Sequence, residues 1–160
     1  LNPIMKFGFE AFCQKCVECG IDGVIIPDLP FKDYEETYKP IADRYDIRVI
    51  MLITPETSEA RVREIDEHTD GFIYMVSSAA TTGAQKDFDS QKQAYFKKIQ
   101  DMHLRNPRMV GFGISNKQTF DAACANSSGA IIGSRFVTLL NEAEGDAEKA
   151  ITQLKEGLKK

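Results

Sequence analysis

The sequence lacks a long hydrophobic run, a recognisable signal peptide and an excess of positive charge. No apolar stretch approaches the roughly 20 residues that a membrane-spanning helix needs. The net charge is -4 and the Lys and Arg residues are scattered, so nothing indicates a surface for nucleic acid or anionic membranes. The chain starts at Leu1, and we therefore expect the native sequence to begin further upstream. These absences favour a cytoplasmic protein.

The dinucleotide-binding fingerprint Gly-x-Gly-x-x-Gly is also missing. Gly111-x-Gly113 supplies only half of it, and it ends an apolar run late in the chain rather than near its beginning. A nucleotide-binding protein of that type is therefore not indicated.

Cysteine is scarce, and three of the four cysteines form a Cys-x-x-Cys-x-x-Cys pattern. An iron–sulfur or zinc site is one interpretation of Cys13, Cys16 and Cys19. The alternative is a helix, because Phe9, Phe12, Cys13 and Cys16 recur at the spacing of one helical face. We favour the helix, with two thiols acting as small apolar side chains, all four cysteines reduced, and no metal.

The remaining composition is that of one globular domain of 160 residues, with 42% hydrophobic and 28% charged residues. Short apolar runs bounded by turn residues predict strands at residues 24–27, 48–53, 71–76, 109–114 and 130–132. Residues 1–3 read as the tail of a strand or loop. Helices are expected at residues 8–19, 34–45 with a kink at Pro40, 58–67, about 89–104, 135–140 and 146–158. A further helix is expected between the strands at 109–114 and 130–132, starting at the capping Ser115.

Strands that alternate with helices predict a parallel sheet with helices outside it. Two architectures fit this pattern, a doubly wound open sheet and a closed (β/α)₈ barrel. The barrel class forms its phosphate site from the loops after strands 7 and 8 and a short extra helix. Gly113, Gly133 and Ser134, followed by the short helix at 135–140, match that arrangement. Paired glycine turns direct backbone N–H groups at one point, as a phosphate requires.

Several motifs together resemble the tryptophan synthase alpha subunit family, in family order and across the whole chain. They are Asn2-Pro3 with Gly8, the run from Asp22 to Pro30, the run from Phe72 to Ser77 with Thr82-Gly83, the run from Gly111 to Ser115, and Gly133-Ser134.

The resemblance implies a (β/α)₈ TIM barrel, here a partial barrel of about five parallel strands, strands 4–8 with their helices. A complete barrel has about 250 residues, so roughly 90 are missing at the amino-terminal side. The implied activity is that of a lyase of tryptophan biosynthesis, which cleaves indole-3-glycerol phosphate to indole and glyceraldehyde 3-phosphate. Pyridoxal phosphate belongs to the beta subunit of the α₂β₂ assembly, so no cofactor is expected in this chain.

The family's catalytic glutamate and aspartate correspond to positions upstream of Leu1, so we expect the chain to be inactive alone. Ser78 and Ala80 depart from the family's closing loop, where arginine and glycine are common. The remaining family roles fall on phosphate ligands Gly83, Gly113, Gly133 and Ser134; substrate contacts Tyr74, Phe112, Ile25, Leu52 and Ile131; closing-loop residue Thr82; and beta-subunit contacts Asn2, Asp28 and Pro30.

Other functions remain open at this point. The chain can be a phosphosugar-binding half-barrel without turnover, or a related phosphate-binding barrel of histidine or tryptophan biosynthesis. The run from Ile26 to Pro30 argues against the related barrels. A partial barrel also exposes two strand edges, and we therefore expect self-association through them.

Overall fold

The computed structural model describes residues 1–76, 85–111, 113–114 and 116–159, with the backbone alone for residues 85–90. The chain forms two compact units, and each is described by itself. Unit 1 comprises Leu1–Tyr74 and Leu104–Pro107, and unit 2 comprises Met75–His103 and Arg108–Lys160.

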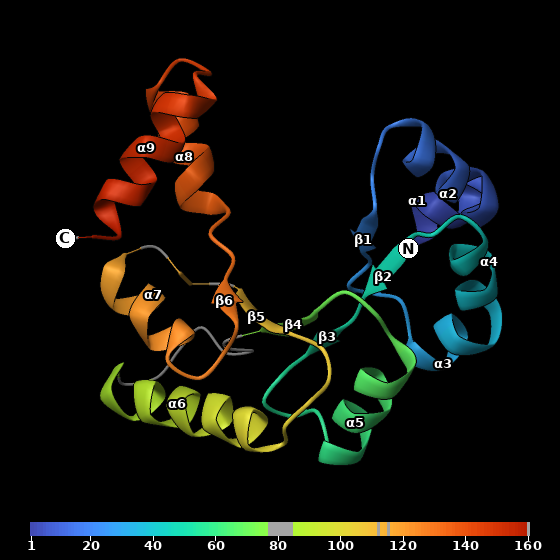
Figure 1. Ribbon diagram of the computed structural model, residues 1–160, viewed down its shortest axis with the longest axis horizontal. Coiled ribbons are helices and arrows are strands. Elements are labelled where there is room, and N and C mark those ends of the chain that lie inside the picture. Colours follow the sequence, from blue (N-terminus) through green and yellow to red (C-terminus); the bar gives the residue numbers. More distant parts are fainter. Residues whose placement is uncertain (77–84, 112, 115, 160) are drawn as a thin grey trace. The chain divides into compact units, whose positions relative to one another are not determined.

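Unit 1 alternates short strands with helices (Figure 1). Its elements are α1 (Asn2–Phe7), α2 (Phe9–Glu18), β1 (Gly23–Ile25), α3 (Phe31–Asp33), the π-helix η1 (Tyr34–Tyr38), α4 (Lys39–Arg44), β2 (Arg48–Ile50), β3 (Leu52–Ile53), α5 (Glu59–His68) and the first half of β4 (Ile73–Val76).

Unit 2 continues the same alternation. Its further elements are α6 (Gln85–Asp101), β5 (Arg108–Gly111), α7 (Lys117–Cys124), β6 (Gly129–Ala130), α8 (Ser134–Glu142) and α9 (Ala147–Gly157).

The strands of unit 1 pair in parallel, as the alternation predicts. β1 lies beside β2 with Ile25 opposite Ile50. The expected single strand at 48–53 is interrupted at Met51, which separates β2 from β3. The backbone N–H of Tyr74 donates to the carbonyl of Met51 at 3.0 Å, which places β4 beside β3.

Fully buried aliphatic side chains form the core of unit 1. Val49, Ile53, Val62 and Ile73 are each at most 2% exposed. Burial of each such side chain contributes about 1.5–3 kcal/mol. These four residues come from β2, β3, β4 and α5, so two of the apolar runs identified in the sequence contribute to this core.

Pro40 divides the helix expected at 34–45, as predicted. Proline has no N–H to donate inside a helix, and the chain widens before it into η1. The N–H of Lys39 donates to the carbonyl of Tyr34, five residues earlier, and α4 then begins. The kink therefore takes the form of one π-helical turn.

Helix caps follow the sequence closely, with one correction. The Ser58 side chain accepts from Arg61 N, and Asp146 caps α9 through Lys149 N. The cap of α7 is Asn116, where Ser115 was expected; Ser115 itself lies outside the described residues.

The first residues form helix α1, whereas a strand or loop tail was expected. Pro3 stands in its first turn, where the missing proline N–H costs nothing. Gly8 follows with a φ of 96°, a conformation suited to glycine, and ends the helix.

The cysteine-rich helix α2 confirms the apolar interpretation of its spacing. Phe9, Cys13 and Cys16 are buried, and Cys19 is exposed beyond the helix end. Burial raises the pKa of Cys13 to about 11, so its thiol stays protonated near neutral pH.

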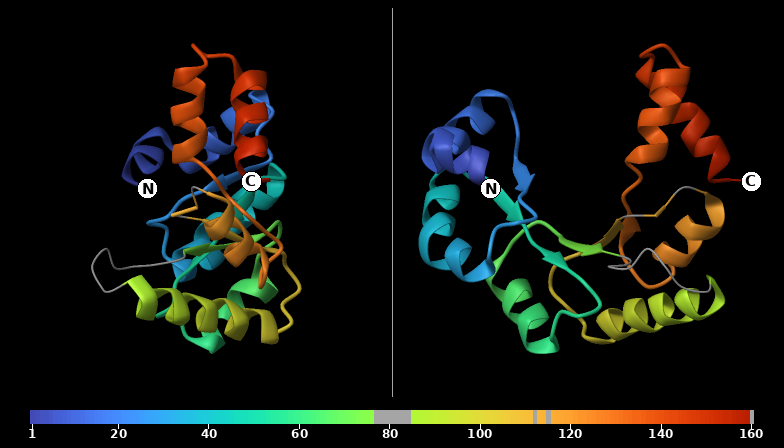
Figure 2. Two further views of the ribbon diagram at one scale, coloured as in Figure 1. Left: turned by 90° about the vertical axis from the view of Figure 1, so that its left-hand side faces the viewer. Right: turned by 180° about the vertical axis from the view of Figure 1, so that it is seen from behind.

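In unit 2, α8 and α9 pack against each other as a helical hairpin (Figure 2). Leu139, Ala143 and Ala150 form its buried centre. On α9, Ala150 is fully buried whereas its neighbour Ile151 is 41% exposed.

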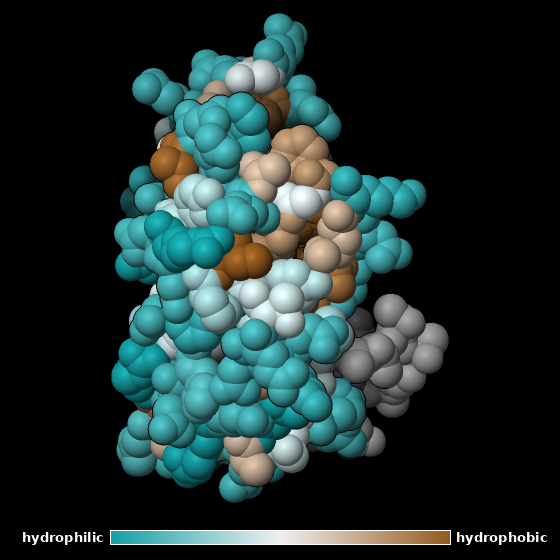
Figure 3. Space-filling view, turned by 90° about the vertical axis from the view of Figure 1, so that its right-hand side faces the viewer, coloured by the Kyte–Doolittle hydropathy of each residue, from teal (hydrophilic) through white to brown (hydrophobic). Residues whose placement is uncertain are grey.

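Unit 1 carries apolar surface as well as an apolar core. Figure 3 views the molecule from the side of α1 and α2 and shows apolar surface bordered by polar residues. No helix in the described part of the chain is long and apolar enough to cross a membrane. The exposed large apolar residues of unit 1 are Met5, Phe7, Val17, Ile21 and Ile25.

Candidate functional site

The site begins with the parallel pair β5 and β6 in unit 2. Met109 lies opposite Gly129, and Val110 lies opposite Ala130. The N–H of Ile131 continues the ladder by donating to the carbonyl of Val110 at 2.8 Å. Because the strands are parallel, their carboxyl ends reach the same edge of the sheet.

Gly113 lies three residues after Val110, beyond the end of β5, and Gly133 lies three residues after Ala130, beyond the end of β6. Gly113 has a φ of 75°, in the left-handed region that favours glycine. A Cβ on Gly133 would meet no atom of the described residues within 4 Å, so none of them fills the space beside it. Gly133 thus leaves open space where the chain turns into α8.

The amino terminus of α8 supplies the binding groups. Its N-cap is Gly133, which has no side chain to satisfy the first N–H groups, and the first turn contains no acidic residue. Ser134, Arg135 and Gly133 are exposed. The free N–H groups and the helix dipole together favour an anion at this end.

The predicted phosphate ligands therefore divide into two groups. Gly113, Gly133 and Ser134 lie at the carboxyl ends of neighbouring strands in unit 2. Gly83 lies outside the described residues, as do Phe112 and Thr82.

The described residues among the predicted apolar contacts lie in strands or next to one. Leu52 and Tyr74 are half-buried on the neighbouring strands β3 and β4 of unit 1. Burial raises the pKa of the Tyr74 hydroxyl, which is therefore neutral at physiological pH. Ile25 ends β1 and is 43% exposed, whereas Ile131 is half-buried in unit 2.

The residues predicted to face a beta subunit are all on the surface of unit 1. The amino-terminal ammonium of Leu1 donates to both carboxylate oxygens of Asp28, at 2.7 and 2.8 Å. Asn2, the next residue, therefore lies near Asp28 on the surface of unit 1. Pro30 is exposed at the start of α3.

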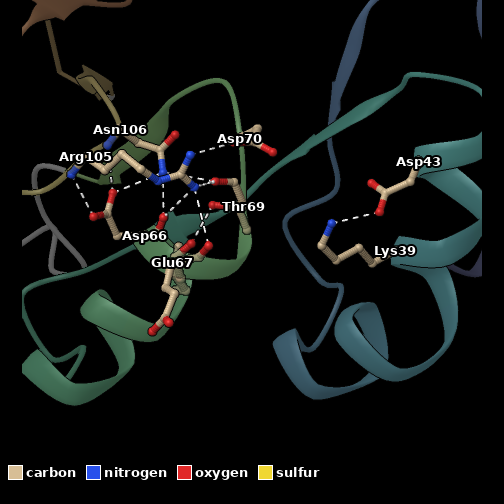
Figure 4. A network of polar contacts seen from close by, with 9 residues as sticks. Lys39, Asp43, Asp66, Glu67, Thr69, Asp70, Arg105 and Asn106 are labelled. Carbon is tan, nitrogen blue, oxygen red and sulfur yellow. Dashed lines mark hydrogen bonds and ion pairs between the residues drawn. The ribbon is translucent and has the colours of Figure 1, made fainter.

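A polar network in unit 1 escaped the sequence analysis (Figure 4). Asp66, on α5, accepts hydrogen bonds from the backbone N–H groups of Arg105 and Asn106. Arg105 also donates to the carbonyl of Thr69 and to the carboxylate of Asp70. This network holds the turn that precedes β5. The dipeptide Asn106-Pro107 was its only signal in the sequence, since it marks a turn.

Parallel strands alternating with helices, and glycine turns beside an uncapped helix at two strand ends, define an α/β protein of the (β/α)₈ barrel class. The chain belongs to the tryptophan synthase alpha chain family, whose model matches residues 1–160. The resemblance is thereby confirmed, and neither the open sheet nor the histidine-pathway barrel remains.

Relatives of known sequence agree. The tryptophan synthase alpha chain of Bacteroides fragilis is 79% identical over 155 residues, which are 97% of this chain and 59% of the relative. That of Bacteroides thetaiotaomicron is 79% identical over 159 residues, which are 99% of this chain and 62% of the relative. The chain thus spans about three fifths of the length of these relatives.

Solved structures have the same fold. The alpha subunit from Campylobacter jejuni superposes with a TM-score of 0.78 at 29% identity, covering 98% of this chain and 61% of that one. The tryptophan synthase A-subunit from Pyrococcus furiosus gives a TM-score of 0.80 at 26% identity, covering 98% and 62%.

Proposed function

We propose that this chain is the phosphate-anchoring part of an alpha-subunit lyase of tryptophan biosynthesis. In the whole protein the reaction is cleavage of indole-3-glycerol phosphate to indole and glyceraldehyde 3-phosphate. The observation that carries the proposal is the uncapped amino terminus of α8, which lies beside Gly113 at the ends of β5 and β6. The family membership supplies the substrate class.

The residues have separate roles in this proposal. The N–H groups at Gly133, Ser134 and Gly113, with Gly83, hold the phosphate. Tyr74, Leu52, Ile25, Ile131 and Phe112 form the apolar wall for indole, and Thr82 acts in the closing loop.

Bond cleavage needs a positioned carboxylate that protonates indole C3 and removes the glycerol hydroxyl proton. We place that carboxylate, and the aspartate at the indole nitrogen, upstream of Leu1. The 160-residue chain alone then binds the phosphate end of the substrate without turnover. In this respect it acts as the phosphosugar-binding half-barrel that the sequence also allowed.

In the whole protein, Asn2, Asp28 and Pro30 face the beta subunit, which carries the pyridoxal phosphate. Their common surface location supports this assignment. A cytoplasmic location fits the four cysteines, which are all free thiols.

Two measurements test the proposal separately. Titration with glycerol phosphate should shift the NMR amide signals of Gly113, Gly133 and Ser134 in a saturable way. Indole release from indole-3-glycerol phosphate should be undetectable. Unmoved amides would refute the phosphate site, whereas measurable indole would refute the upstream placement of the carboxylates.

A further inference from the structure

Unit 1 contains a polar pocket that shares no residue with the predicted phosphate site of unit 2. It has a volume of about 260 Å³ and lies where β2 starts, at Arg48. None of the predicted substrate residues of unit 1, Ile25, Leu52 and Tyr74, lines this pocket. We name this cavity the Tyr34 pocket, and its polar lining is Tyr34, Lys39, Asp43, Asp46, Arg48 and Asp70.

The π-helical turn builds one wall of this pocket. In an α-helix, residues five apart point about 140° away from each other, because each residue turns by about 100°. The hydrogen bond from Lys39 N to the carbonyl of Tyr34 instead stacks Lys39 over Tyr34. Both side chains therefore line the same cavity, and Asp43 joins them one turn further along α4.

The Tyr34 hydroxyl is the least satisfied group of the pocket. The residue is 3% exposed, and no hydrogen bond from its hydroxyl to another described residue is present. Burial, followed by the charges of Asp43 and Asp70, raises its pKa to about 12. The neutral hydroxyl, near the charges of Asp43 and Asp70, is therefore free to hydrogen-bond with a group that enters the pocket.

The charges around the pocket balance. Lys39 contacts Asp43 at 2.8 Å, Arg48 contacts Asp46 at 2.9 Å, and Arg105 contacts Asp70 at 2.8 Å (Figure 4 shows the first and third). Asp43 and Asp70 each use one oxygen in these ion pairs and keep the other for a ligand. A wall with both signs and no large excess of either favours a ligand that itself carries both.

We propose that the Tyr34 pocket binds a small zwitterionic α-amino acid. Its ammonium group donates to Asp43, Asp70 and the Tyr34 hydroxyl, and its carboxylate accepts from Lys39 and Arg48. The pocket is large enough for a short side chain, which Ile47 and Val49 meet with apolar surface. This site is independent of the proposed lyase function.

The test is an NMR titration of the 160-residue chain with L-alanine, followed at the amides of Arg48 and Val49. Ethylamine and propionate, which each carry one of the two charges, are titrated in parallel. L-Alanine should give saturable shifts at millimolar concentration, and each half-ligand should bind roughly tenfold more weakly. No saturable shift with L-alanine, or equally strong binding of ethylamine, would overturn the proposal.

Two variants locate the binding. Tyr34→Phe removes the hydroxyl and keeps the ring that packs 6.3 Å from Phe31. Lys39→Met removes the carboxylate contact and leaves the core untouched. Both should weaken L-alanine binding at least roughly fivefold. The control is Lys32→Met, which breaks an exposed ion pair with Glu36 outside the pocket. Unchanged affinity in Lys39→Met, or an equal loss in Lys32→Met, would refute the assignment.

Discussion

Asp66 and Asn106, 40 residues apart in the chain, bind each other through three hydrogen bonds (Figure 4). The Asp66 carboxylate accepts from the Asn106 backbone N–H at 2.8 Å and from its side-chain amide at 3.0 Å. The same amide donates to the Asp66 carbonyl at 2.8 Å. Asn106 is only 4% exposed, so it depends on these partners.

Asp66→Ala should therefore destabilise the protein by about 2–4 kcal/mol, because it leaves the backbone N–H groups of Arg105 and Asn106 without their acceptor. Urea unfolding measures the change. The control is Asp101→Ala, which breaks only the exposed pair with Lys97 and should cost less than about 0.5 kcal/mol. Equal effects of the two substitutions would show that the buried network contributes nothing.

Ser134→Asp should stabilise the fold and abolish phosphate binding. A carboxylate at the first residue of α8 interacts favourably with the helix dipole, by about 0.3–1 kcal/mol, and repels a phosphate from the same N–H groups. Thermal unfolding and glycerol phosphate titration give the two results. Thr138→Asp adds the same charge one turn later and should retain binding. Retained binding in Ser134→Asp would place the phosphate elsewhere.

The raised pKa of Cys13 predicts that the free energy of unfolding falls in alkaline solution. Its pKa is about 11 in the folded protein, raised by burial, against an ordinary value of 9.0. The folded state therefore holds this proton more tightly, so its contribution is complete below pH 9 and disappears as the pH rises towards 11. Urea unfolding between pH 8 and about 10.5 should show a steeper decline for the native sequence than for Cys13→Ala. Parallel curves would contradict the assignment.

We also expect unit 1 to mediate self-association. β1 pairs with β2 along one edge, and no partner strand covers its other edge among the described residues. The exposed apolar side chains of unit 1 favour the same outcome.

Ile25→Lys should convert the associated form to monomer in sedimentation velocity, because a lysine on an edge strand opposes strand pairing. Ile151→Lys on α9 is the matched control, since Ile151 is 41% exposed and Ile25 is 43% exposed. A monomeric native chain would remove this prediction.

Local chemistry explains why much of the fold was predictable. Ser58 and Pro40 act on groups within a few residues of themselves, and the cap and the kink that they form were correctly predicted. The glycine turns after β5 and β6 were recognisable for the same reason.

The sequence-based predictions were wrong or incomplete where two adjacent residues could each form the same structure, or where residues far apart in the chain come into contact. Asn116 and Ser115 are both capping residues, and the sequence does not show that the side chain of Asn116 reaches Thr119 N. The interruption at Met51 lies inside a uniformly apolar run. Asp66 and Asn106 carry no mutual signal, because only the tertiary structure brings them together.

The π-helical turn at Tyr34–Tyr38 holds one more residue than an α-helical turn between the same two ends would. Removing a single residue from it, such as Thr37, would return the segment to α-helical phase and rotate everything before it by about 100° relative to α4. Tyr34 and Lys39 would then face different directions although neither had been changed. A one-residue deletion at an exposed position is thus enough to dismantle this pocket, and gaps in an alignment at this point would mark the relatives that lack it.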